Sequence, residues 1–236
     1  GAKLVGLGGL GWGDPTAASV RLLAATAARV AASYGSLTVV IPKGGADLVR
    51  GGASGALLGA YRFARYMTGD RVPKHSLAKV KLLVAKSTPE LKDALEQGVA
   101  LGESVNHARD LVNAPPNDLT PTALAEFAKE QAAAVGIQCK VWDKKGIEKL
   151  GMHLLLAVSR GSSQEPRFIH MIYKPKGVKK PRKVDFVGKG LNFDAGGQPQ
   201  WHELRLTDGE AKLWKLPLVG LDQSFSYRVH GGGTWT

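Results

Sequence analysis

Two residues whose chemistry suits metal binding, Lys189 and Asp194, lie five positions apart in the glycine-rich segment VGKGLNFDAGG at residues 187–197. Glycines let the backbone bend sharply and come close to a bound ion. A carboxylate is a hard oxygen ligand for Mn²⁺, Mg²⁺ or Zn²⁺, whereas a lysine amine can bind a metal only when it is neutral. A surface lysine and aspartate in an ordinary loop would give the same pattern. The residues alone therefore leave a metal site and a solvated loop both open.

Two other motifs are incomplete. Residues 6–11 (GLGGLG) match the dinucleotide-binding pattern G-x-G-x-x-G, which places a pyrophosphate at the N-terminus of the next helix. Asp14 comes between the third glycine and that helix, and it would put a negative charge where the phosphate belongs. We therefore expect a tight turn rather than a nucleotide site. His202 and Glu203 begin like the zinc motif H-E-x-x-H, but Leu206 stands where the second histidine is needed.

Strand and helix signals alternate along the first 85 residues. Such alternation predicts an α/β layer whose strands are at least partly parallel. A longer helix then begins at Thr88 and Pro89, which suit the cap and the first turn. The elements predicted from apolar periodicity are a short strand at 3–6, helices at 16–34 and 46–67, strands at 36–41 and 79–85, helices at 88–112 and 120–135, and strands at 137–142, 154–158, 168–173 and 184–187.

Three glycines spaced by four residues, Gly51, Gly55 and Gly59, lie in the second predicted helix. In a membrane this spacing would indicate helix dimerisation, but arginines at positions 50, 62 and 65 exclude a membrane there. We expect the glycines to let this helix pack closely on the sheet. No uninterrupted apolar run in the chain approaches the roughly 20 residues that a membrane span needs.

The composition is that of a globular protein with a basic charge balance. The chain has 236 residues, 44% of them hydrophobic, and its 32 Lys and Arg exceed its 20 Asp and Glu by 12. Six basic residues lie in the loop at 174–183, which has no aromatic side chain to stack on bases, so we expect no nucleic-acid partner. The single cysteine, Cys139, excludes an intramolecular disulfide and favours a reducing compartment. We expect a cytoplasmic protein, or an organellar one if a transit peptide has been removed.

Four stretches make the chain resemble the leucyl aminopeptidase (cytosol aminopeptidase) family of two-metal exopeptidases. The stretches ARDLVNAPPNDLTP at 108–121 and FVGKGLNFDAGG at 186–197 are highly specific to that family. The stretches GALLGAYRFARY at 55–66 and LLLAVSRGSSQEP at 154–166 add to the match. The resemblance extends over residues 4–197.

The resemblance implies an α/β fold in which an N-terminal α/β domain is joined by a long helix to an incomplete, zinc-peptidase-like α/β catalytic domain. The implied parts are an N-terminal domain at 1–87, a linker helix and Pro-rich turn at 88–120, the start of the catalytic domain at 121–197, and an unmatched tail at 198–236.

The resemblance also implies a chemistry, the removal of N-terminal residues such as leucine from peptides. Lys189 matches the lysine that binds one metal in such enzymes, and Asp194 matches the aspartate that bridges two divalent ions, Mn or Zn. Bound metals of this kind hold the substrate amine, polarise the scissile carbonyl and activate a water. The resemblance further implies a homo-oligomer, a hexamer, and peptide substrates as partners.

The chain departs from the family pattern after Gly197, where relatives supply a catalytic lysine, further carboxylate ligands and a catalytic arginine. Only Asp208, Glu210 and Lys212 echo that signature here, and we interpret the echo as coincidence, because a lysine replaces arginine poorly. No residue of this chain is therefore assigned a catalytic role. Because Lys189 and Asp194 alone cannot hold two cations, we expect the chain to be inactive by itself. The alternative is a catalytically silent structural or regulatory subunit.

Overall fold

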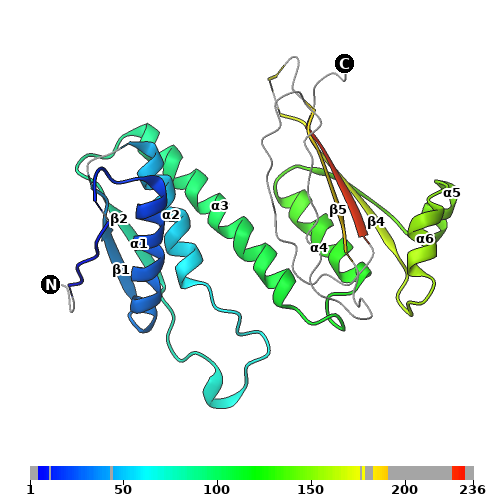
Figure 1. The fold of residues 1–236 in the computed structure, drawn as a ribbon, viewed down its shortest axis with the longest axis horizontal. Helices are drawn as coiled ribbons and strands as arrows, with labels where there is room; N and C mark the ends of the chain where they lie inside the picture. Colours follow the sequence, from blue (N-terminus) through cyan, green and yellow to red (C-terminus); the bar gives the residue numbers. More distant parts are fainter. Residues whose placement is uncertain are drawn as a thin grey trace. The chain divides into compact units, whose positions relative to one another are not determined.

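The computed structural model describes residues 5–10, 12–42, 45–175, 177–178, 183–190 and 225–231 (Figure 1). The chain forms two compact units, unit 1 at Gly1–Asn113 and unit 2 at Ala114–Thr236. Both units combine helices with strands, so the predicted mixed α/β class is confirmed. Among the described residues, no helix is long and apolar enough to span a membrane.

Unit 1 places three helices beside a two-stranded sheet. Strands β1 and β2 pair in parallel, with Ser36 opposite Lys79 and Val40 opposite Leu83, so the parallel arrangement predicted from the alternation is confirmed. Thr16 caps the first helix, because its hydroxyl accepts a hydrogen bond from the Ser19 amide. The elements are α1 (Ala17–Val30), β1 (Ser36–Val40), α2 (Ala46–Ala60), β2 (Lys79–Leu83) and α3 (Pro89–Asn113), with 3₁₀ turns at Ala31–Ser33 and Gly69–Arg71.

The core of unit 1 lies where the helices meet the strands. Its buried apolar side chains come from every helix and from the β1 region, which ties the sheet to the helix layer. Burial of such side chains is the main favourable term in folding. The core members are Val20, Val39, Ile41, Leu48, Val49 and Ala94.

The glycines of α2 pack against α1, and not against the sheet as the sequence predicted. A Cβ added to Gly51 would lie 2.5 Å from the carbonyl oxygen of Ala17, and one on Gly55 would meet the Arg21 backbone. The prediction that the glycines allow close packing was right, but the partner was wrong. The sheet side of α2 is formed instead by Gly52, whose Cβ position lies 2.9 Å from Ile41 Cδ1.

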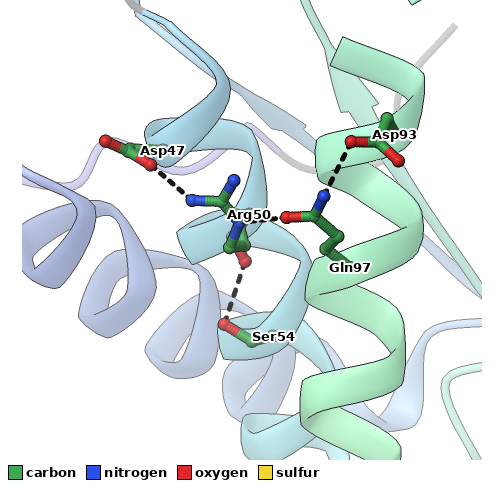
Figure 2. Close-up of polar contacts among 5 residues, drawn as sticks. All are labelled: Asp47, Arg50, Ser54, Asp93 and Gln97. Carbon is green, nitrogen blue, oxygen red and sulfur yellow. Dashed lines mark hydrogen bonds and ion pairs between the residues drawn. The ribbon is translucent and has the colours of Figure 1, made fainter. Parts of the chain in front are cut away.

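Helix α3 packs on α2 through glycines as well, and a polar network runs along the same contact. A Cβ on Gly98 would lie 2.6 Å from the carbonyl oxygen of Arg50. Figure 2 shows the Arg50 guanidinium between Asp47 of the same helix and Gln97 of α3. Arg50 Nε donates a hydrogen bond to Gln97 Oε1 at 2.9 Å. Gln97 in turn donates to Asp93 at 2.7 Å. Helix α3 is therefore an integral part of unit 1.

Unit 2 contains a four-stranded sheet in the order β3-β4-β6-β5. Strand β4 runs antiparallel to β3 and parallel to β6, and β6 runs antiparallel to β5. Helix α4 contacts β3 and β4, and Thr120 caps it in front of Pro121. The elements are α4 (Pro121–Ala134), β3 (Gln138–Trp142), α5 (Lys144–Lys149), α6 (His153–Ser159), β4 (Arg167–Tyr173), β5 (Asp185–Lys189) and β6 (Phe225–Gly231).

Several predicted elements were wrong. Residues 154–158, predicted as a strand, belong to helix α6, because a short apolar run fits a partly buried helix as well as a strand. Helix α2 ends at Ala60 rather than at residue 67, and residues 5 and 6, the described part of the strand predicted at 3–6, form neither strand nor helix. Strand β6 was not predicted, although Phe225, Tyr227 and Val229 alternate with polar residues along it. That alternation indicates a strand, whereas the central place of β6 in the sheet depends on tertiary pairing.

Candidate functional site

The predicted metal-binding lysine, Lys189, is the last residue of strand β5. Its backbone pairs with Ser226 of β6, and the rest of β5 pairs along β6 as far as Asp185 opposite His230. The glycines on either side of it, Gly188 and Gly190, are buried. Pairing with β6 thus fixes the backbone at position 189 between two buried glycines, within the glycine-rich segment at 187–197.

The other predicted site residues lie outside the described residues. These are Asp194, the second proposed metal ligand, and the signature-like residues Asp208, Glu210 and Lys212 together with His202 and Glu203. Within the described part of the chain, no group of three His, Cys, Asp or Glu side chains could hold a metal ion. The donor set named from the sequence is therefore one amine and one carboxylate. Two divalent cations repel each other and need more donors than that.

The structure joins two of the family-like stretches through a polar cluster around Tyr61, the first residue after α2. The Tyr61 hydroxyl donates to Asp110 Oδ1 at 2.7 Å and accepts from Asn113 Nδ2 at 3.1 Å. The Arg109 guanidinium carbon lies 4.2 Å from the centre of the Tyr61 ring, within range of a cation–π interaction. Residues near 61 and near 110 were singled out in the sequence only as marks of resemblance. No sequence signal revealed that they meet.

Two side chains of α3 also satisfy the open carbonyls at the end of α2. Asn106 Nδ2 donates to the Leu57 carbonyl at 3.1 Å, and Arg109 donates to the Leu58 carbonyl at 3.0 Å. The last carbonyls of a helix have no partner within it, so such donors stabilise the helix end. These bonds stabilise the end of α2 at Ala60. Its groups bond one another and the backbone, which is the pattern of a structural cluster.

Burial and, after it, the hydrogen bond to Asp110 raise the pKa of the Tyr61 phenol above 10.0, while the Asn113 hydrogen bond lowers it. A raised pKa means that the folded state favours the protonated phenol more than the unfolded state does. The resulting stability is present below pH 10 and is lost as the pH rises through the folded pKa.

We therefore expect the free energy of unfolding of the native chain to fall above pH 10 more steeply than that of Tyr61→Phe. Urea titrations followed by circular dichroism between pH 8 and pH 11 measure this difference. The exposed Tyr34→Phe is the matched control, and it should follow the native chain. Parallel curves for the native chain and Tyr61→Phe would contradict the described cluster.

The single cysteine and the basic segment of unit 2 show no catalytic arrangement in the described residues. Cys139 is half-buried in β3, and burial raises the pKa of its thiol above 9.0, opposed by the nearby Lys129 charge. A raised pKa disfavours the reactive thiolate. In the same sheet, the Trp142 ring of β3 stacks on the His170 ring of β4, with ring centres 6.0 Å apart. Four of the six basic residues of the loop at 174–183 lie outside the described part of the chain: Lys176, Lys179, Lys180 and Arg182.

A family model for the cytosol aminopeptidase catalytic domain matches residues 106–200. A probable cytosol aminopeptidase of Aquifex aeolicus is 42% identical over 165 residues, which are 69% of this chain and 32% of the relative. One from Solibacter usitatus is 39% identical over 221 residues, 92% of this chain and 44% of the relative. The chain thus spans between a third and a half of these relatives.

Solved structures share the fold of this chain. The bottromycin maturation enzyme BotP in complex with Mn superposes with a TM-score of 0.63 at 26% identity, covering 94% of this chain and 48% of BotP. A mutant of tomato leucine aminopeptidase superposes with a TM-score of 0.72 at 24% identity, covering 97% of this chain and 47% of that one, and supports the fold alone. The chain, which spans only part of the length of these relatives, belongs to the cytosol aminopeptidase family.

Proposed function

We propose that this chain carries the N-terminal α/β domain and the first metal-binding segment of a metal-dependent aminopeptidase, and that it is inactive by itself. The observation that carries the proposal is the family match at residues 106–200, which includes both Lys189 and Asp194. In this proposal residues 1–87 are the N-terminal domain, α3 is the connecting helix, and residues 121–197 begin the catalytic domain. The substrates are peptides, from which N-terminal residues such as leucine are removed in the cytoplasm.

The two proposed ligands fit a divalent metal in kind but not in number. Asp194 offers hard oxygen donors, and Lys189 offers a nitrogen that binds only without its proton. When bound, two Mn²⁺ or Zn²⁺ ions would polarise a scissile carbonyl and activate a water. Lys189 and Asp194 leave most coordination positions of two ions unfilled, so no catalytic step is derived for this chain alone. Hexameric assembly stays part of the proposal.

We expect the chain by itself to bind Mn²⁺ weakly, without saturation at micromolar concentrations. Isothermal titration calorimetry of the native chain and of Asp194→Asn measures this Mn²⁺ binding. Both proteins should give little heat, because neither has enough donors to hold the ions. Lys183→Ala, an exposed change just before β5, serves as the control. Saturable binding of two Mn²⁺ ions at micromolar concentration would show that the chain holds a complete site.

The second candidate is a catalytically silent subunit built on the aminopeptidase fold. It rests on the incomplete ligand set, because only Lys189 and Asp194 of the residues matched by the family model are proposed as metal ligands. The two candidates differ in whether joining the remaining part of a relative to this chain gives activity.

A further inference from the structure

The two-stranded sheet of unit 1 is narrower than the helix layer beside it. Helix α1 contacts β1 and α2 contacts β2, while α3 packs on α2 and extends the layer by one more helix. Among the described residues, β1 and β2 are the only strands of this sheet, so the edge of β2 away from β1 carries no paired strand. The main-chain groups along such an edge can bond one further strand.

An apolar groove of about 230 Å³ lies next to this edge of β2. It is lined by β2 and the two residues before it, by α2 and by α3, but not by β1, so it lies on the side of β2 away from β1. All its lining side chains except Lys79 are apolar, and one of them, Leu95 of α3, is 39% exposed. A strand added to β2 would cover this apolar surface with the side chains of one of its faces.

The opposite face of the sheet is basic along β2. Lys79 and Lys81 are exposed, whereas Val80 and Leu82, which alternate with them, pack on the core of unit 1. Because successive side chains point to opposite faces of a strand, both lysines lie on the outer face. Their partners on β1 are a serine and a threonine, so no carboxylate of the sheet neutralises them. Acidic side chains on an added strand would form favourable cross-strand pairs with these lysines.

We propose that the free edge of β2 binds an extended peptide segment in which apolar and acidic residues alternate. The apolar side chains fill the groove against α2 and α3, the acidic side chains pair with Lys79 and Lys81, and the peptide backbone bonds β2. Addition of a strand to an exposed sheet edge is a common way of capturing extended peptides. The inference is independent of the proposed metal ligands, because β2 and the groove belong to unit 1 and Lys189 belongs to unit 2.

The test titrates the full chain into a fluorescent heptapeptide of alternating valine and glutamate, capped at both ends, and follows its anisotropy. One control peptide carries the same valines and glutamates in separate blocks, and a second carries lysine in place of glutamate. We expect saturable binding of the alternating acidic peptide and weaker binding of both controls. Hydrogen exchange of the β2 amides should slow when the alternating peptide binds, because a bonded amide exchanges only when its bond opens.

Reversing both charges, with Lys79→Glu and Lys81→Glu in one variant, should weaken binding of the alternating peptide by about tenfold or more, because each favourable pair becomes a like-charge pair. Leu95→Gln should weaken it as well, because apolar contact in the groove is lost. The matched control is Lys144→Glu, the same charge change at an exposed position of α5 in unit 2, and it should leave binding unchanged. Circular dichroism checks that each variant is folded.

Three results would overturn the proposal. Equal binding of the alternating and the block peptide would mean that charge alone attracts them, without strand pairing. Unchanged affinity after both lysine charges are reversed would remove the acidic partner. Failure of the native chain to bind the alternating peptide saturably would show that the edge of β2 accepts no such strand.

Discussion

Replacing Gly55 with alanine is expected to lower the free energy of unfolding by about 1–3 kcal/mol, the range found for overpacked sites. Helix propensity alone predicts the opposite, because alanine is favoured over glycine inside a helix by about 1 kcal/mol. In α2 the added Cβ would lie 2.9 Å from both the Cα and the carbonyl carbon of Arg21. These are backbone atoms of α1, which cannot rotate away, so the helices would have to separate.

Urea unfolding followed by circular dichroism measures the effect, and Gly35→Ala is the matched control. A Cβ on Gly35 meets no atom within 4 Å, so that variant should stay within about 0.5 kcal/mol of the native chain. Gly59→Ala should behave like Gly55→Ala, since its Cβ would lie 2.5 Å from Ala25 Cα. A gain in stability for Gly55→Ala would mean that α1 and α2 lie farther apart than the structure places them.

The second large effect concerns the proposed metal ligands. It is measured in a chimera, in which residues 1–197 of this chain are joined to the part of the Solibacter usitatus relative that follows the segment equivalent to residues 1–197. Asp194→Asn and Lys189→Met in this chimera should each lower the release of leucine from leucine amide by about 100-fold or more. Changes to groups that only support a ligand typically cost about 10–100-fold, and loss of a ligand should cost at least as much.

The control for these two variants is Lys183→Ala, which removes an exposed charge six residues before Lys189. It should keep the activity of the chimera. Metal content, measured by mass spectrometry of the inorganic ions, should fall with activity in Asp194→Asn and Lys189→Met. Full activity in either variant would remove that residue from the proposed ligand set.

The sequence predicted the regular elements of unit 1 because their signals are local. The parallel pair β1 and β2 and the long helix α3 follow from apolar periodicity and from the cap at Thr88. What the glycines at 51, 55 and 59 touch could not be predicted. Their spacing of four places them on one face of α2, but whether that face packs on helix α1 or on the sheet depends on tertiary packing.

Unit 2 was harder to predict, for two physical reasons. The run at residues 154–158 is apolar on all sides, so its period does not distinguish strand from helix, and it forms α6. Strand β6 carries an alternating pattern at Phe225, Tyr227 and Val229 that was overlooked, but its position between β4 and β5 could not be predicted from a local pattern. Lys189 was predicted in a glycine-rich bend after a strand at 184–187, whereas it is the last residue of strand β5. The cluster of Tyr61 with Asp110 joins residues 49 apart in sequence, which no local pattern reveals.

The measurement that tests the central claim most directly compares this chain with the chimera for metal-dependent release of leucine from leucine amide. Both proteins are assayed at equal concentration with Mn²⁺ or Zn²⁺ and again with a chelator. We predict that the chimera releases leucine only with metal, and that the chain alone does not exceed the buffer rate. Metal-dependent release by the chain alone, or a folded chimera that stays inactive, would contradict the account.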